Sequence, residues 1–343
     1  MTRPTIHDVA REAGVSLSTV DRVLNERDGV RQNTKTRVQE AIDKLGFQRN
    51  LAAANLSRKR RYRLAFILPD GPNAFMRTLE EDLCEAASAA VRDLTSIETI
   101  KKVPPFDAGA LADLLRKLDP ETLDGVAIVA TDATVVRIAV RELRARGIAV
   151  ITLVSDLPGS ERQGFIGIDN VQAGRTAGSL LGRFCRGRQG RIAMVTGSML
   201  VRDHAERRLG FEQVLRTEFP EQSLIAPLEG FDDKDRVREQ LAAKLAEDPE
   251  VIGVYSMGAG NRGIAEALAE LSGERAISVV AHELTRFSRE ALLDGTFDAV
   301  LHQNSRREVE SAIRLLREIL DGQTDTSRPE PIGIEIFMRD NLP

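Results

Sequence analysis

The chain has 343 residues, of which 42% are apolar, and a formal net charge of -4. This length predicts two or three compact units, each with its own core. No apolar run reaches 18 residues, and the N-terminal MTRPTIHDVAREAG lacks the apolar segment of an export signal, which argues against a membrane span and against secretion. Cys84 and Cys185 have no CxxC or histidine partner in the sequence, so we expect two reduced thiols and no metal site.

The charge is unevenly distributed along the chain. Residues 1–63 hold 14 Lys and Arg against 7 Asp and Glu, whereas the remainder holds 34 against 45. A small basic segment ahead of a larger acidic one predicts a polyanion-binding module joined to a second function.

The first elements expected are two short helices. Thr5 and Asp8 have the spacing of a capping box, which predicts a helix over residues 6–13. Gly14 permits a tight turn, and Ser16 is a good cap for a second helix of about nine residues. This pattern is typical of a helix-turn-helix, whose second helix enters the major groove of DNA. The expected outer face of that helix carries Leu17, Ser18, Asp21 and Arg22.

A third helix is expected from about Asn33 to Leu45, ending at Gly46. Together the three helices predict an all-α helix-turn-helix domain over residues 1–49. Residues 50–61 follow as NLAAANLSRKRR. This segment is either a hinge helix that orders only when it docks or a flexible linker, because a helix this short is marginal in water.

From Tyr62 onward, apolar runs bounded by turn residues alternate with amphipathic helical stretches. The runs are RLAFILP, GVAIVAT, VITLV, FIGID, RIAMVTG, LIAPLEG, VIGVYSM, ISVVAHE and AVLHQN. Alternating strands and helices predict mainly parallel α/β sheets, and the length of residues 62–343 favours two lobes. In such sheets ligands bind at the carboxyl ends of the strands, so the residues just after each run are the candidates.

The candidates at the strand ends are carboxylates, amides, histidines and an arginine, with one aromatic ring. They are Asn73, Phe75, Asp132, Asp156, Asp203, His204, Arg207, Glu283 and Gln303. This set suits a polyhydroxylated ligand, because sugar hydroxyls both donate and accept and sugar rings pack on aromatics. Asp132 and Asp156 are equally consistent with helix N-caps. His204 and His282 are either an acid/base pair or, as we favour, ordinary hydrogen-bonding groups.

A glycine motif offers a competing interpretation. Gly258, Gly260 and Gly263 spell GAGNRG after a strand and before a helix, with Glu283 about twenty residues later, as in dinucleotide-binding sites. The motif lies late in the chain, behind a complete strand and helix series, so we favour a glycine loop in which Gly258 and Asn261 approach another ligand. The sequence contains no P-loop, GxSxG or HExxH, so we expect no cofactor, no metal and no catalytic site.

The motifs DVAREAGVSLSTVDRVLN, TRVQEAIDKLGF and NLAAANLS resemble the DNA-binding head and hinge of the LacI/GalR family of bacterial repressors. The remainder resembles that family's effector domain, whose two-lobed fold is shared with periplasmic sugar-binding proteins. The resemblance covers nearly the whole chain. It implies an N-lobe of about residues 62–163 and 305–325 and a C-lobe of about residues 164–302 and 326–343.

The resemblance also implies roles in DNA binding. The second helix reads the major groove, with Ser18, Asp21 and Arg22 as base-reading residues, and the hinge places Leu56 as a wedge between base pairs of the minor groove. Other implied contacts, many of them to phosphate, are Thr5, Ser16, Leu17, Thr19, Asn25, Arg31, Lys35, Arg37, Arg49, Asn50, Ala53 and Arg58. Asp21 stands where the family usually has serine, and Arg49 where it commonly has proline. An acid at Asp21 can accept from a cytosine amine, which predicts an unusual operator.

In the effector domain, Asn73 and Phe75 match the amide and stacking ring of sugar binders, Glu283 their usual aspartate, and Gln303 their hinge-side glutamine. We therefore expect a cytoplasmic, nucleoid-associated regulator, most simply a repressor of carbohydrate or polyol genes. Its expected partners are a neutral sugar or sugar alcohol and a pseudo-palindromic operator that it binds as a homodimer. The alternatives are a solute-binding protein and an NAD(P)-linked oxidoreductase built on GAGNRG.

Overall fold

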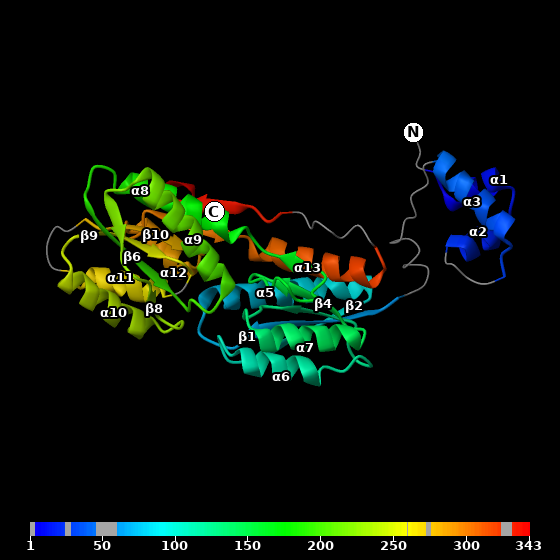
Figure 1. Ribbon diagram of the computed structural model, residues 1–343, viewed down its shortest axis with the longest axis horizontal. Helices are drawn as coiled ribbons and strands as arrows, with labels where there is room; N and C mark the ends of the chain where they lie inside the picture. Colours follow the sequence, from blue (N-terminus) through cyan, green and yellow to red (C-terminus); the bar gives the residue numbers. More distant parts are fainter. Residues whose placement is uncertain (1–3, 25–28, 46–59, 259, 272–275, 324–330) are drawn as a thin grey trace. The chain divides into compact units, whose positions relative to one another are not determined.

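The computed structural model describes residues 4–24, 29–45, 60–258, 260–271, 276–323 and 331–343 (Figure 1). Its contacts divide the chain into two units, Met1–Arg60 and Arg61–Pro343. This division falls close to the expected start of the effector domain at residue 62. Each unit has its own core and is described by itself.

The first unit contains three helices, α1 (Ile6–Ala13), α2 (Leu17–Leu24) and α3 (Gln32–Leu45). The predicted capping box is present, with the Thr5 amide donating to Asp8 Oδ2 at 2.9 Å. Gly14 ends α1 with a φ of 60°, a left-handed conformation that glycine adopts without steric cost. Small apolar residues of all three helices form one core, among them Val9, Val20 and Val38. These contacts confirm the helix-turn-helix arrangement.

The second unit has two lobes, each built on one sheet. The first sheet is wholly parallel in the order β2-β1-β3-β4-β5. Its strands are β1 (Tyr62–Pro69), β2 (Thr95–Val103), β3 (Gly125–Ile128), β4 (Ala149–Leu153) and β5 (Phe165–Ile166). One face is covered by α5 (Ala74–Ala90) and α13 (Ser305–Leu320), and the other by α6 (Ala108–Lys117) and α7 (Thr134–Ala145) (Figure 1). A short 3-10 turn, η1 (Val91–Asp93), follows α5.

The second lobe contains a seven-stranded sheet in the order β12-β11-β10-β9-β6-β7, with β8 paired to β6. Its strands are β6 (Gly190–Thr196), β7 (Gln222–Leu224), β8 (Leu228–Glu229), β9 (Val251–Ser256), β10 (Ser278–His282), β11 (Ala299–Gln303) and the antiparallel β12 (Ile334–Phe337). Helices α8 (Asn170–Phe184) and α9 (Arg202–Glu218) pack on one face. The other face carries α10 (Lys234–Glu247), α11 (Asn261–Ala269) and α12 (Arg286–Leu293), and η2 (Arg339–Asn341) follows β12.

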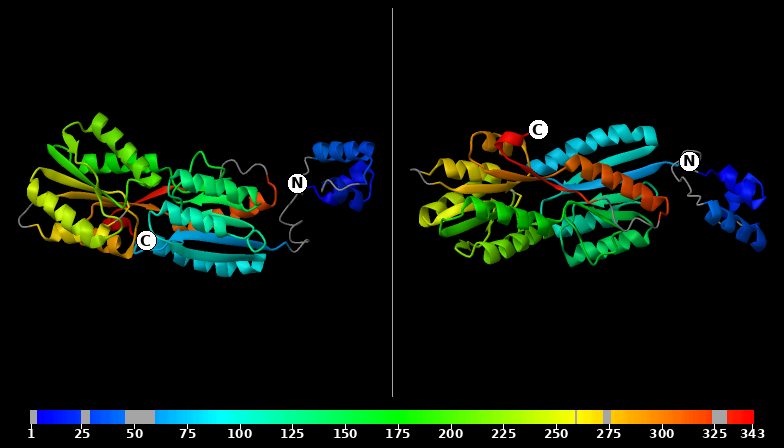
Figure 2. Two further views of the ribbon diagram at one scale, coloured as in Figure 1. Left: turned by 60° about the horizontal axis from the view of Figure 1, so that its bottom comes forward. Right: turned by 90° about the horizontal axis from the view of Figure 1, so that it is seen from above.

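The chain crosses between the lobes three times. It leaves the first sheet after β5, returns between β11 and α13, and crosses again between α13 and β12 (Figure 2). Segments far apart in sequence therefore meet in one lobe, as where α13 packs beside α5. The parallel strands read as apolar runs because helices bury both of their faces.

Three details differ from the sequence expectation. Strand β2 was not predicted, because its sequence TSIETIKKV alternates with polar residues at a sheet edge. The run LIAPLEG forms parts of two short strands, β7 and β8, rather than one. Strand β5 belongs to the first sheet, so the first crossing falls after Ile166 instead of at residue 163.

Two glycines bring α8 and α9 unusually close together. A Cβ added to Gly174 would lie 1.9 Å from the Arg207 carbonyl oxygen, and one added to Gly210 would lie 2.0 Å from that of Val171. These distances are far below van der Waals contact, so each position requires glycine. The close approach fixes the backbone of α9 at Arg207 against α8.

Candidate functional site

A cavity lies between the two lobes, at the carboxyl ends of the strands of both sheets. The volume of the cavity is about 80 Å³, counted as the space that the centre of a water molecule can occupy. One water needs roughly 10–15 Å³ by the same measure, so the cavity can hold a small organic molecule. The first lobe lines it with Pro69, Asn73, Phe75, Met76, Pro105, Phe106, Val129, Ala130, Thr131, Val154 and Ser155. The second lobe contributes Val201, Asp203, His204, Arg207, Asp232, Gly258, Glu283 and Gln303.

Most of the candidates at strand ends meet in this cavity. Those that line it are Asn73, Phe75, Asp203, His204, Arg207, Gly258, Glu283 and Gln303. Three others, Asp132, Asp156 and Asn261, do not line it. Most strand-end candidates therefore converge on one cavity, although a position after a strand does not guarantee access to it. Their role in effector binding stays a prediction.

The three exceptions have other partners. Asp132 pairs with Arg137 in its own lobe and with Arg202 of the other lobe. Asp156 accepts from Arg162 Nε at 2.5 Å and from the Thr152 hydroxyl at 2.7 Å. The alternative that Asp132 caps a helix is also wrong, because Ala133 precedes α7 without a side-chain cap.

Asn261 stabilises the turn after β9 instead of facing the cavity. It accepts from the Ser256 hydroxyl at 2.6 Å and donates to the His282 carbonyl oxygen at 2.8 Å. His282 itself is buried, and its Nε2 lies 2.9 Å from the Tyr255 hydroxyl. Burial lowers the pKa of His282 well below its usual range, so it is a neutral core residue and not an acid/base partner of His204.

Sequence reasoning missed two prominent lining residues, Phe106 and Asp232. Phe106 follows the unpredicted edge strand β2, and Asp232 follows the two-residue strand β8. The signals that point to them are modest: PPFD after a charged, alternating run and GFDD after LIAPLE. Both are strand-end positions, so the rule applies to them once the strands are known.

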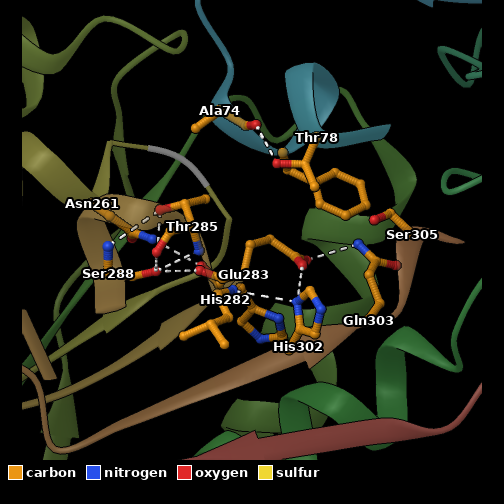
Figure 3. A network of polar contacts seen from close by, with 12 residues as sticks. Ala74, Thr78, Asn261, His282, Glu283, Thr285, Ser288, His302, Gln303 and Ser305 are labelled. Atoms are coloured by element: carbon orange, nitrogen blue, oxygen red, sulfur yellow. Dashed lines mark hydrogen bonds and ion pairs between the residues drawn. The ribbon is translucent and has the colours of Figure 1, made fainter. Parts of the chain in front are cut away.

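The polar wall centres on Arg207 and Glu283. Arg207 is 2% exposed, donates through Nε to Asn170 Oδ1 at 2.8 Å and through Nη1 to the Met257 carbonyl oxygen at 2.9 Å. Its Nη2 lies 3.7 Å from Glu283 Oε1. The same oxygen accepts a hydrogen bond from Gln303 Nε2 at 2.8 Å (Figure 3). Arg207 therefore offsets the charge of Glu283, while the Nε and Nη1 of Arg207 already donate hydrogen bonds to other residues.

Asp203, His204 and Asp232 form a second polar group in the cavity. His204 Nδ1 lies 2.8 Å from the Ser198 carbonyl oxygen, which can only accept, so Nδ1 carries a proton. Its Nε2 lies 3.8 Å from Asp203 Oδ2. Asp232 accepts from Asn73 Nδ2 at 3.1 Å. Burial raises the pKa of Asp232, and nearby His204 opposes that rise.

Four of the residues that line the cavity each carry a buried polar atom that has no hydrogen-bond partner among the described residues. These atoms are Ser155 Oγ, Asp203 Oδ1, Glu283 Oε2 and Gln303 Oε1. Three of the four can only accept. Because buried polar groups are normally satisfied, these residues have acceptor capacity that the described part of the protein does not use.

Backbone strain is concentrated around the same cavity. Of the six described non-glycine residues with positive φ, four line it: Phe106 (64°), Val154 (64°), Asp232 (60°) and Glu283 (70°). Such conformations cost on the order of 1–3 kcal/mol each and tend to occur at functional sites. The strain therefore supports the cavity as the functional centre of this unit.

The glycine motif serves mainly helix packing. A Cβ on Gly260 would lie 2.5 Å from Val237 Cγ2, and one on Gly263 would lie 2.2 Å from the Lys234 carbonyl oxygen. Helix α10 thus occupies the space beside both glycines, and only Gly258 of the three lines the cavity. This packing argues against a dinucleotide on the motif. The described residues also contain no cluster of three metal-ligating side chains.

In the first unit, three of the four residues predicted on the outer face of α2 are exposed, and the fourth is half-buried. Leu17 is 41% exposed, Ser18 and Arg22 are exposed, and Asp21 is half-buried. Ser16 caps the helix by accepting from the Thr19 amide at 3.2 Å. Of the other expected DNA contacts, Thr5 and Arg31 are exposed and Thr19 and Lys35 are half-buried.

One expected phosphate contact has a structural role, because Arg37 Nη2 donates to the Ala13 carbonyl oxygen at 2.5 Å and holds the turn between α1 and α2. Six residues assigned to DNA binding lie outside the described residues: Asn25, Arg49, Asn50, Ala53, Leu56 and Arg58.

Among the helices that the structure describes, none has both the length and the apolar character of a membrane span.

Comparison with known proteins agrees with both units. Residues 5–50 match the family "Bacterial regulatory proteins, lacI family", and residues 64–324 match "Periplasmic binding protein domain". Catabolite control protein A of Streptococcus mutans serotype c is 28% identical over 213 residues, covering 62% of this chain and 60% of that protein. The HTH-type transcriptional regulator RegA of Clostridium saccharobutylicum is 48% identical over 71 residues, 21% of each chain.

Among solved structures, a glucose-galactose binding protein of Geobacillus stearothermophilus, GanP, superposes with a TM-score of 0.74 at 21% identity, covering 83% of this chain and 99% of that one. At this identity the likeness concerns the fold alone. The family matches cover the helix-turn-helix head and nearly all of the two-lobed unit behind it. Over residues 64–324 the chain therefore belongs to the periplasmic-binding-protein domain family, and residues 5–50 form a helix-turn-helix domain of the lacI type.

Proposed function

We propose that the chain is a non-enzymatic, DNA-binding transcriptional regulator whose interlobe cavity binds a neutral sugar or sugar alcohol as effector. The observation that carries the effector class is the set of unsatisfied acceptors on Asp203, Glu283 and Gln303. A polyol supplies several hydroxyl donors at once, and Phe75 and Phe106 offer rings against which its carbon face can pack.

The charges of the cavity favour an effector without a phosphate group. Asp203 and Glu283 are carboxylates among the residues that line the cavity, and their repulsion of a phosphate is strong in a buried site. Arg207 is the natural cation to balance a phosphate, but two of its nitrogens already donate to protein carbonyl and amide oxygens.

The head is the second half of the proposal. The exposed Leu17, Ser18 and Arg22 on α2 support major-groove reading, with the neighbouring Asp21 accepting from a cytosine amine. We infer a cytoplasmic homodimer in which two heads bind the half-sites of a pseudo-palindromic operator and Leu56 enters the minor groove. In the simplest scheme, the regulator represses carbohydrate or polyol genes, and the effector acts either as an inducer or as a co-repressor.

The test begins by selecting operators from random DNA with the full chain. Fluorescence anisotropy then measures operator affinity with D-glucose, D-galactose, D-arabinose, their alditols and their phosphates. We expect one unphosphorylated compound to change operator affinity by about 5- to 150-fold. Its binding should require Asp203, while Arg22→Ala should abolish operator binding but leave effector binding intact. A response to a sugar phosphate alone, or to NAD, would contradict the proposal.

A further inference from the structure

Three contacts of different chemistry join the two lobes beside the cavity. Asn73 donates to Asp232 at 3.1 Å. The rings of Phe106 and Phe231 meet edge to face, with centroids 6.1 Å apart. The Asp132 carboxylate lies 3.5 Å from Arg202 Nη1. In each contact the first residue belongs to the first lobe and its partner to the second.

The third contact differs from the other two because neither of its residues lines the cavity. Asn73, Asp232 and Phe106 all do, so a ligand can alter their contacts directly. Asp132 and Arg202 instead line a separate, open groove beside the cavity.

The ion pair is also anchored within both lobes. Asp132 pairs with Arg137 at the start of α7, and Arg202 Nε lies 2.7 Å from Glu206 Oε1 one turn along α9. The two side chains are 19% and 37% exposed, so solvent screens the pair only in part. Each partner is therefore held in position before the lobes meet.

We propose that Asp132 and Arg202 are positioning residues that hold the lobes closed and thereby tighten effector binding without touching the effector. The pair exists only while the lobes are together, so its free energy adds to the closed arrangement alone. A ligand enclosed by both lobes then binds more tightly, in proportion to the closed fraction. This inference rests on the proposed effector role of the cavity, although its first measurement needs no effector.

The first measurement is the distance between the lobes in the full chain without ligand. Spin labels on the exposed Cys84 of α5 and on an introduced Ala246→Cys of α10 report it, while the buried Cys185 stays unlabelled. Asp132→Asn and Arg202→Gln should each lower the ratio of closed to open molecules by about two- to fivefold, as expected for a partly exposed pair. The double variant should match either single variant, because the same contact is lost.

Two matched control variants distinguish loss of the contact between Asp132 and Arg202 from a general loss of charge. Glu142→Gln removes a partner of Arg116 within the first lobe, and Arg262→Gln removes the partner of Glu266 within α11 of the second lobe. Both controls should keep the distance distribution of the parent chain. An unchanged distribution in Asp132→Asn and Arg202→Gln, or an equal change in the controls, overturns the inference.

The second measurement is calorimetric binding of D-glucose, D-galactose and D-arabinose. For any sugar that binds, Asp132→Asn and Arg202→Gln should each raise Kd by the same factor as they lower the closed fraction. If the distance between the lobes changes in these variants but none of the three sugars binds, the positioning role of Asp132 and Arg202 is supported and the proposed effector is contradicted. If a sugar binds but the distance between the lobes is unchanged, the proposed effector is supported and the positioning role is contradicted.

Discussion

The two walls of the cavity differ sharply in chemistry. The first lobe supplies mostly apolar and aromatic side chains, such as Phe75, Met76 and Phe106, whereas the second supplies Asp203, Arg207 and all the other charged groups of the lining. The first wall therefore offers shape and ring contact, which depend weakly on ligand stereochemistry. The second offers directed acceptors, which depend strongly on it. For the proposed effector, we therefore expect both lobes to contribute affinity and the second lobe to contribute most of the selectivity.

The largest effect should come from removing the central cation of the polar wall. Arg207→Met leaves Glu283, Asn170 and a carbonyl oxygen without their buried partner, which typically lowers the free energy of unfolding by about 3–5 kcal/mol. Arg137 of the first lobe is only partly buried, so Arg137→Met should lower the free energy of unfolding by less than about 1 kcal/mol. Urea denaturation of both variants checks this, and equal losses would show that the walls are not so different.

A smaller effect separates affinity from selectivity. Phe106→Ala should weaken all bound sugars by a similar factor, about tenfold or less, because ring packing is worth roughly 0.5–1.5 kcal/mol. Asp203→Asn removes a charged acceptor worth about 1.5–3 kcal/mol and should change the order of preference among D-glucose, D-galactose and D-arabinose. Calorimetric titration of the three sugars provides the measurement. A uniform loss in Asp203→Asn would break the assignment of selectivity to the second lobe.

The smallest effect concerns a carboxyl group behind the polar wall. Glu308 on α13 is fully buried, and neither of its oxygens has a hydrogen-bond partner among the described residues. Burial, followed by the nearby Glu283, raises the pKa of Glu308 well above its usual range. A folded-state pKa above the unfolded one contributes stability below the unfolded pKa that is lost as pH rises through the folded pKa.

Glu308→Gln should therefore gain stability relative to the parent chain as pH rises above about 4.5, the ordinary glutamate range. We expect a difference of about 1 kcal/mol between acidic and neutral pH, measured as the midpoint of urea unfolding. Glu310→Gln on the exposed face of the same helix is the matched control and should show no such trend. A parent chain that instead gains stability over Glu308→Gln with rising pH would refute the assignment.

The sequence predicted the head almost completely, because its determinants are local. The Thr5 and Asp8 box, the turn at Gly14 and the spacing of Val20 and Val38 each act within a few residues. The cavity was predicted in part, because strand ends identify positions but not directions. Asp203 and Asp132 both follow apolar strands, yet Asp203 lines the cavity while Asp132 pairs with Arg137 and Arg202.

Longer-range determinants were missed for a physical reason. Phe106 and Asp232 follow strands that are short or alternate with polar residues, and such strands exist because a neighbouring strand pairs with them. The contact of Asp132 with Arg202 joins residues of different lobes, and no local pattern encodes it. Pairing and lobe closure therefore mark the limit of what local patterns can predict here.

The left-handed backbone at Asp232 constrains how the chain can diversify. At a φ of 60°, Asn, Asp and Gly are tolerated far better than branched or bulky residues. Natural variation at this position is thus expected to alternate among an acceptor-only carboxylate, a donor-bearing amide and no side chain at all. Asp232→Asn needs one nucleotide change and preserves the loop, so it is an economical first step by which a descendant, or an engineered biosensor, acquires a different effector.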